Sequence, residues 1–429
     1  MATRLTRRAL IASAPGLYLA SKGAGRAYAQ EKTIKVGVIQ PMSGNLSPYS
    51  QEGQPALEYI VKKINAEGGI KSMGGAKIQL VIADDASQPA RTASEARRLI
   101  TQDDVSMIVG TLLSAQMLAI SPVIDEYKVP TLAMWAGGAR ASYLYSLGFP
   151  YDRGYAKTMA DFAAALGNYN RKINTAVIAC SNYEAGQQVT KYLQQMLPER
   201  GIKVIAEVPL DTQAQDHTAS MLRIRSLKPD AVIGLMQPRE GILLMQARYG
   251  MNYHDSIFIG NSPYSDQVIW RELGPDIGKA VLTRNLFGMA SYSEGAKIAS
   301  MQELASELRS KGNLKSEVGQ ATIQAAQAAR IMQQVLELAG STEREAINQA
   351  LKKVNIPYGD PHLYLARAEG LAFGEDRMPK DSTSMMVQWS ADRKLEVVWP
   401  DFTRRPNPGS GRRRIPNLRG AVQIMIRLD

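Results

Sequence analysis

A serine between an apolar run and an amphipathic stretch is the residue whose type and position most clearly indicate a chemical function in this sequence. Ser114 follows the predicted strand 105–110 and opens the predicted helix 114–127. Its hydroxyl can cap that helix, and the free main-chain N–H groups beside it, at residues such as Ala115, can hold a carboxylate. Most serines at such a junction only cap the helix. The residues therefore indicate an anion site and leave the simple cap open.

The sequence lacks the motifs on which common catalytic and nucleotide sites depend. The turn 40–45 after the first predicted strand has one glycine, whereas a dinucleotide pyrophosphate needs several close-approach glycines. No Gly-Lys-Ser/Thr phosphate loop, Gly-x-Ser-x-Gly elbow or His-Glu-x-x-His pair occurs. Asp84 and Asp85 are neighbours on a predicted strand, so they point to opposite faces and make a poor acid-base pair. The sequence thus disfavours an enzyme and predicts no cofactor.

Cysteine and histidine usage argues against disulfides and metals. The single cysteine, Cys180, cannot form an intramolecular disulfide, and it ends an apolar run, so we expect it to be buried. The three histidines, at positions 217, 254 and 362, lack the short ligand spacing of a zinc site. We therefore predict no metal site.

The net charge of +11 is concentrated at the two ends of the 429-residue chain. Residues 1–29 carry five basic residues and no acid, and residues 401–429 carry seven arginines against two aspartates. Each end contributes +5, which leaves +1 for residues 30–400. A nearly neutral body has no basic face for phosphates, which argues against a nucleic-acid partner. Hydrophobic residues make up 45% of the chain, as in a folded globular protein.

The composition of both charged ends indicates segments that lie outside the folded body. Residues 1–29 combine Arg7 and Arg8, a short apolar stretch and the sequence Ala-Tyr-Ala up to Ala29, which predicts a twin-arginine signal peptide cleaved after Ala29. An uncleaved anchor or a fortuitous flexible leader is the alternative. No later apolar run reaches the roughly 20 residues of a membrane helix, so we expect no transmembrane segment in the mature chain. Residues 401–429, rich in Arg, Pro and Gly, predict a flexible basic tail.

Short β-branched runs alternate with longer amphipathic stretches from residue 34 onward, a pattern that predicts doubly wound parallel sheets. The predicted strands are 34–39, 77–83, 105–110, 129–134, 175–180, 204–209, 230–236, 256–259 and 280–283. The predicted helices are 52–67, 90–102, 114–127, 155–166, 185–199, 218–227, 241–249 and 265–273. Two α/β lobes of similar size therefore follow one another in sequence.

The remaining elements return to these two lobes. Three helical stretches, 294–311, 317–339 and 342–354, are too many for the alternation of one lobe, and two strand-like runs follow at 385–389 and 395–399. We predict that residues 33–150 and 284–357 form lobe 1. Residues 151–283 and 358–400 are predicted to form lobe 2.

Five short motifs occur in an order that resembles a known family. They are 34–44, 64–70, 82–85, 109–111 with Ser114, and 127–130. Over residues 33–400 the chain resembles the branched-chain amino-acid (Leu/Ile/Val-type) periplasmic binding proteins of ABC importers. The resemblance implies a type I periplasmic-binding fold, with two Rossmann-like lobes, a three-crossing hinge and a ligand trapped between them. It also implies a periplasmic location, ABC permease and ATPase partners, and a monomer.

The same resemblance implies roles for individual residues. Ser114, with Ala115 beside it, matches the serine that holds the ligand carboxylate in the family. Tyr49 matches an aromatic residue of the first loop, and Tyr183 matches one from the second lobe. The loop after the fourth strand, where the family binds ligand, contributes three more candidates here, Trp135, Ala136 and Gly137. For the aromatic residues, packing beneath a loop is the alternative.

Departures from the family leave the ligand class open. Amino-acid binders place an acid after a second-lobe strand to accept the ligand ammonium, but residues 260–266 contain no acid before Asp266. A buried ammonium without such an acceptor costs several kcal/mol. Trp135 offers a ring suited to a flat apolar ligand. A branched-chain or related amino acid, an aromatic or other organic acid, and a receptor module that presents its ligand to a signalling system all stay open.

Overall fold

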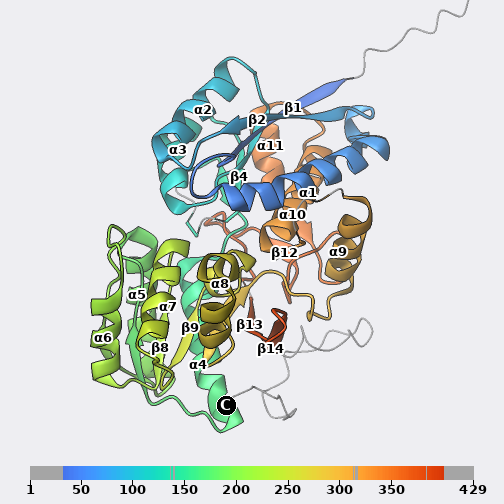
Figure 1. The fold of residues 1–429 in the computed structure, drawn as a ribbon. Coiled ribbons are helices and arrows are strands. Elements are labelled where there is room, and N and C mark those ends of the chain that lie inside the picture. The colour runs from blue at the N-terminus through green and yellow to red at the C-terminus, as the bar shows by residue number, and fades with distance from the viewer. Residues whose placement is uncertain are drawn as a thin grey trace, which may run out of the picture. The chain divides into compact units, whose positions relative to one another are not determined.

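The computed structural model describes residues 32–135, 137–138, 141–312, 314, 317–382 and 384–400. The predicted signal peptide and basic tail therefore lie outside the described residues. Within the described part, one parallel and one mostly parallel sheet each carry their own set of helices, as Figure 1 shows. This is the predicted α/β architecture of two Rossmann-like lobes.

The first sheet has five parallel strands in the order β2-β1-β3-β4-β5. Its strands are β1 (Thr33–Gln40), β2 (Lys77–Asp84), β3 (Met107–Gly110), β4 (Thr131–Ala133) and β5 (Leu144–Ser146). Its crossover helices are α1 (Ser47–Ala66), α2 (Pro89–Thr101) and α3 (Ser114–Tyr127). β3 is buried along its whole length, which explains its continuous apolar run.

The second sheet has seven strands in the order β14-β13-β10-β9-β8-β6-β7. The parallel strands are β6 (Thr175–Ile178), β7 (Lys203–Glu207), β8 (Ala231–Gly234), β9 (Ile257–Gly260) and β10 (Leu286–Ala290). β13 (Met385–Trp389) and β14 (Leu395–Trp399) extend the sheet antiparallel. Its helices are α4 (Lys157–Ala165), α5 (Glu184–Glu199), α6 (Thr218–Leu227), α7 (Pro238–Gly250) and α8 (Gln267–Leu282).

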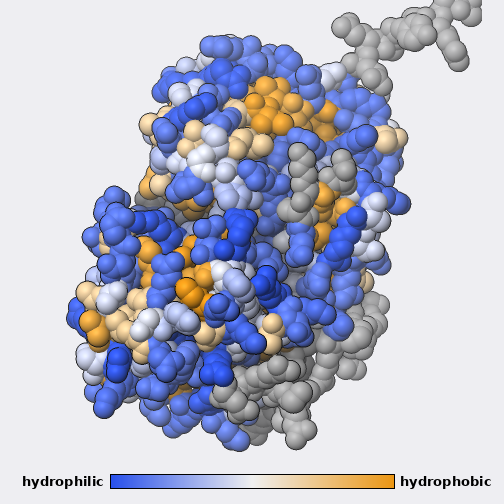
Figure 2. Space-filling view, viewed as in Figure 1, coloured by the Kyte–Doolittle hydropathy of each residue, from blue (hydrophilic) through white to orange (hydrophobic). Residues whose placement is uncertain are grey.

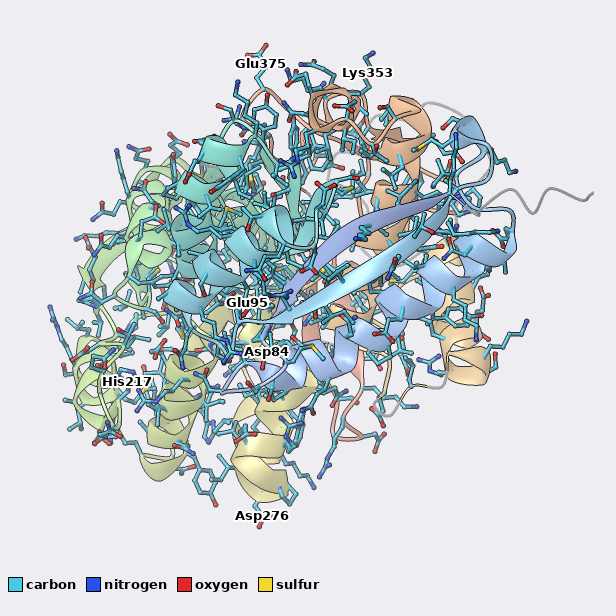
Figure 3. All side chains as sticks on the ribbon, turned by 90° about the horizontal axis from the view of Figure 1, so that it is seen from above. Asp84, Glu95, His217, Asp276, Lys353 and Glu375 are labelled. Atoms are coloured by element: carbon cyan, nitrogen blue, oxygen red, sulfur yellow. The ribbon has the colours of Figure 1, made fainter. Side chains whose placement is uncertain are left out.

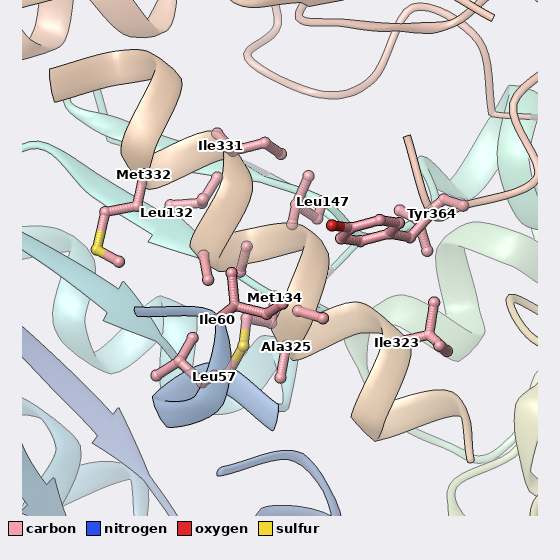
Figure 4. Close-up of a cluster of buried hydrophobic side chains, with 14 of the residues drawn as sticks. Leu57, Ile60, Leu132, Met134, Leu147, Ile323, Ala325, Ile331, Met332 and Tyr364 are labelled. Carbon is pink, nitrogen blue, oxygen red and sulfur yellow. The ribbon is translucent and has the colours of Figure 1, made fainter. Parts of the chain in front are cut away.

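Three late helices return to the first sheet. They are α9 (Ala299–Lys311), α10 (Gln320–Ala339) and α11 (Arg344–Leu351), and α10 lies along α1 (Figure 1). α10 is buried nearly all round and rich in alanine, so it can approach its neighbours closely. In the core around it, Leu57 and Ile60 of α1 and Leu132 of β4 belong to the same buried cluster as Ile331 and Met332 of α10 (Figure 4).

The chain passes between the lobes three times, as predicted. It crosses after β5, again between β10 and α9, and a third time between β12 (Leu371–Ala372) and β13. β12 pairs with β11 (Asn355–Ile356). Short helical turns complete the structure at η1 (Lys71–Met73), η2 (Tyr151–Ala156), η3 (Leu166–Tyr169) and η4 (Ser262–Tyr264).

The predicted lobe limits need two corrections. The predicted strand 280–283 is the end of α8, which continues past a break at Gly274 (φ +74°) and buries Val281 and Leu282. The strand is β10 instead, so residues 284–290 belong with the second sheet and not with lobe 1. Residues 363–373 pack into the core of the first lobe, although the prediction placed 358–400 in lobe 2. The sequence of β10, Leu-Phe-Gly-Met-Ala, contains no β-branched residue, which explains why it was missed.

Candidate ligand-binding pocket

A pocket enclosing about 700 Å³, part of it open to solvent, lies at the carboxyl ends of strands from both sheets. From the first lobe come residues of the segments after β1, β3 and β4, among them Tyr49 at the start of α1, Ser114 at the start of α3, and Trp135. From the second lobe come residues after the first crossing and after β6, β8 and β9. Open α/β sheets bind ligands at this edge, because the loops there leave a crevice.

Six of the eight predicted site residues line this pocket. They are Tyr49, Ser114, Trp135, Gly137, Tyr183 and Asp266. Ala115 follows Ser114 in α3 but does not line the pocket, and Ala136 lies outside the described residues. The structure therefore brings the predicted residues of both lobes together, while their contact with a ligand stays a prediction.

Ser114 is the first residue of α3 and does not cap it, because the N-cap position is Leu113. Gln116 instead reaches back to the residues before the helix. Its Oε1 accepts the main-chain N–H groups of Leu112 (2.9 Å) and Leu113 (2.8 Å), and its Nε2 donates to Asp85 Oδ2 (2.6 Å). The Ser114 side chain caps nothing here, and Ser114 lines the pocket.

The Ser114 hydroxyl reaches across to the second lobe. Its Oγ lies 3.1 Å from the hydroxyl of Tyr151, which donates to Glu184 Oε2 at 3.2 Å. Gly137 makes room for the Tyr151 ring, since a Cβ there would sit 2.2 Å from Cε1 of that ring. Within the described part of the chain no acceptor faces the main-chain N–H of Ser114, which points out of the first turn of α3.

Five aromatic rings line the pocket. Tyr49 and Trp135 belong to the first lobe, whereas Tyr151, Tyr155 and Tyr183 belong to the second. Burial raises the pKa of Tyr49, Tyr155 and Tyr183 well above the ordinary value, so these phenols stay neutral. The walls are thus uncharged surfaces on which an apolar or aromatic body can stack.

Asp266 is the only carboxylate among the described lining residues of this pocket, and it is 5% exposed. Its side chain caps α8 by accepting the N–H of Val268 (3.0 Å), and burial raises its pKa to about 6. A second buried acid, Glu52 of α1, accepts the N–H of Thr322 (3.1 Å) at the start of α10. Burial, followed by the negative charge of Asp266, raises the pKa of Glu52 to about 8. The two acids come from different lobes.

Sequence reasoning missed Tyr151 and Tyr155. They stand on η2, the turn that follows the first crossing between lobes, and no family motif singled them out. Their four-residue spacing just after Phe149-Pro150 is the signal that could have found them, because it puts both rings on one helical face.

Cysteine and metal predictions can be compared with the described residues alone. Cys180 is buried, as predicted, and its Sγ accepts the N–H of Leu235 at 3.2 Å. In that part of the chain no group of three His, Cys, Asp or Glu side chains could hold a metal ion. Asp84 and His217, labelled in Figure 3, belong to different lobes.

Two parallel-sheet lobes, three crossings and a pocket lined by both lobes define a two-lobed ligand-binding protein. A family model described as periplasmic binding protein matches residues 33–394. The chain belongs to the periplasmic binding protein family. Membership indicates a place outside the cytoplasm and a function in binding.

Curated relatives agree with that assignment, and solved structures agree with the fold. The chain is 28% identical to "Leu/Ile/Val-binding protein homolog 7" of Brucella suis biovar 1 (strain 1330), over 86% of this chain and 92% of the relative. The substrate-binding protein LivJ of Streptococcus pneumoniae, solved with isoleucine, superposes with a TM-score of 0.72 at 21% identity, covering 86% of this chain and all of LivJ. A solute-binding protein of Rhodopseudomonas palustris BisB5, solved with 3,4-dihydroxybenzoic acid, superposes with a TM-score of 0.69 at 22% identity. The match covers 85% of this chain and 95% of that protein.

The described helices include none that is both long and apolar enough to cross a membrane. In the face drawn in Figure 2, hydrophilic residues dominate, and hydrophobic ones gather in small patches.

Proposed function

We propose that this protein is the solute-binding component of an ABC importer and that it binds a small carboxylate with an apolar or aromatic body. The observation that carries the proposal is the position of Ser114. Ser114 is the first residue of α3, it does not cap the helix, and it lines a pocket walled by neutral aromatic rings. A helix start offers N–H groups and a positive dipole end to an anion.

Hinge closure is the proposed mechanism. A ligand held at Ser114 by the first lobe and covered by Tyr151 and Tyr183 of the second lobe contacts both lobes at once. Contacts made only when the lobes are together shift the population toward the closed form. The permease then recognises that form. Nothing in this cycle alters the ligand chemically, and one monomer suffices.

Branched-chain or related amino acids and aromatic acids are both candidates for the ligand. Asp266 favours an amino acid, since it is a carboxylate in the pocket that can accept an ammonium. Five rings favour an aromatic carboxylate. LivJ with isoleucine and the Rhodopseudomonas protein with 3,4-dihydroxybenzoic acid support one candidate each. Export through a twin-arginine signal at residues 1–29, with cleavage after Ala29, completes the proposal.

Isothermal titration of the mature, exported protein tests it. The panel contains leucine, isoleucine, valine, phenylalanine, benzoate and 4-hydroxybenzoate, and the matched controls are the amides of the same compounds. We expect at least one carboxylate to bind and its amide to bind far more weakly, with scattering in solution showing compaction on binding. Absence of binding across the panel, or turnover of a bound compound, would overturn the proposal.

A further inference from the structure

A small compartment lies behind the ligand pocket, inside the first lobe. It encloses about 270 Å³ between the end of β1, α1, the loop after β3 and α10. Three residues, Tyr49, Leu112 and Trp135, line both this compartment and the main pocket. The two spaces are therefore neighbours that share a wall.

Two buried polar atoms in this compartment have no hydrogen-bond partner among the described residues. They are Nε2 of Gln40, a side chain 3% exposed, and Oγ1 of Thr111, which is fully buried. Leaving a buried amide or hydroxyl unpaired costs about 1–3 kcal/mol. Such groups are expected at sites where a partner from outside the chain completes them.

The backbone at Thr111 is also strained. Its φ is +66°, in the left-handed region that a β-branched residue rarely adopts. The strand neighbour holds it there, because the Thr111 N–H donates to Ile39 O at 3.0 Å. The preceding Gly110 (φ +141°) has no room for a side chain, since a Cβ would lie 2.1 Å from the same oxygen. Strain of this kind concentrates at ligand sites, where a side chain must be presented in one direction.

The character of the compartment limits what it can hold. Its free core has room for about one water-sized group. Among the described residues no charged side chain lines it, so a carboxylate or an ammonium would be buried there without a counter-charge from them. A hydroxyl fits, because its oxygen can accept from Gln40 Nε2 and form a second hydrogen bond with Thr111 Oγ1.

We propose that this compartment is a specificity subsite for a hydroxyl group of the ligand, held by Gln40 and Thr111. The inference rests on the proposed function and narrows the solute to hydroxylated carboxylates. The carboxylate lies at Ser114, the body lies among the aromatic rings, and the hydroxyl passes between Tyr49 and Trp135. A ligand with the hydroxyl pairs both buried atoms, whereas a ligand without it gains nothing there and therefore binds more weakly.

Matched ligand pairs test the subsite by isothermal titration. Suitable pairs are 4-hydroxybenzoate with benzoate, 3-hydroxybenzoate with benzoate, and threonine with its isostere valine. We expect the wild-type protein to prefer the hydroxylated member of at least one pair by about tenfold or more. Thr111→Val should reduce the ratio of the two affinities to nearly one, because the hydroxylated partner loses more affinity than the partner without the hydroxyl.

Further variants separate this role from a structural one. Thr111→Ser keeps the hydroxyl and should keep the preference, whereas Gln40→Met should lose it without altering the strained turn. Thr131→Val is the matched control, because Thr131 is equally buried but its hydroxyl already donates to Val129 O (3.1 Å). That control should leave the preference unchanged.

The outcomes distinguish the inference from the function on which it rests. Carboxylates that bind with no preference for a hydroxyl overturn the subsite and leave the proposed function intact. Equal losses for both members of a pair in Thr111→Val also overturn it, since a compartment filled by structural water would behave in that way. A wild-type protein that binds no carboxylate overturns both proposals.

Discussion

The two walls of the pocket differ in how their polar groups are used. On the second-lobe side, Asn261 of the pocket wall and Ser181 behind it are already paired within the lobe. Asn261 both accepts from the N–H and donates to the C=O of Met236 (2.9 Å each), and Ser181 accepts from Gln237 N–H and donates to Glu240. On the first-lobe side, the Ser114 hydroxyl bonds to Tyr151 of the other lobe, and in the compartment behind the wall two buried atoms of Gln40 and Thr111 lack partners among the described residues.

This difference suggests that the two lobes contact different parts of a ligand. Hydrogen-bonding groups without internal partners gain most from a ligand, because binding removes the cost of leaving them unpaired. The first lobe is therefore suited to capturing the polar ends of a ligand. The second lobe, with Tyr151, Tyr155 and Tyr183, is suited to covering its apolar body. Substitutions on the two walls should then differ in size and in kind.

Removal of the Ser114 hydroxyl is expected to have the largest effect. A hydrogen bond to a charged group contributes about 1.5–3 kcal/mol, so Ser114→Ala should weaken carboxylate binding roughly tenfold to a hundredfold in isothermal titration. Ser262, a serine of the second-lobe wall, supplies the matched control, and Ser262→Ala should cost less than about threefold. Equal losses in the two variants would remove the asymmetry between the walls.

Loss of a covering ring should have a smaller effect. Tyr183→Leu removes a stacking surface worth about 1 kcal/mol, so we expect about a fivefold loss of affinity. Tyr183→Phe keeps the ring and should bind nearly as the wild type does. If the Phe variant loses as much as the Leu variant, the Tyr183 hydroxyl binds ligand, and the second lobe also captures polar groups.

Much of the fold could be predicted, because buried strands and amphipathic helices leave periodic patterns. β13 and β14 match their predicted limits, 385–389 and 395–399, residue for residue. The prediction omits β10 because this strand contains no β-branched residue. It ends α8 too early because an apolar run such as 280–283 fits a helix as well as a strand. A local sequence pattern therefore identifies a helix or a strand only where it fits one of the two and not the other.

The site could be predicted in part for a related reason. Ser114 and Trp135 directly follow parallel strands, so strand order alone places them at one sheet edge. Tyr151 depends on where the chain crosses between lobes, and the compartment of Gln40 and Thr111 depends on side-chain packing against α10. Neither crossing geometry nor packing leaves a periodic signal in sequence.

The acid pair that spans the lobes allows a prediction for pH. Glu52 and Asp266 are buried, and their pKa values are raised to about 8 and about 6, mainly by burial, with Tyr49 and Arg271 as their neighbours. The folded state therefore binds protons more tightly than the unfolded state does.

A raised carboxyl pKa makes its stabilising contribution at low pH and loses it as the pH rises through the folded-state value. The free energy of unfolding should thus fall between pH 5 and pH 8, by about 1 kcal/mol or more from this pair. Glu52→Gln keeps an oxygen for the Thr322 N–H but cannot ionise, so urea unfolding of this variant should show a flatter pH profile. Glu58→Gln, an exposed change on the same helix, should retain the wild-type slope. Parallel pH profiles for the wild type and Glu52→Gln would show that ionisation of Glu52 beside Asp266 does not lower the free energy of unfolding.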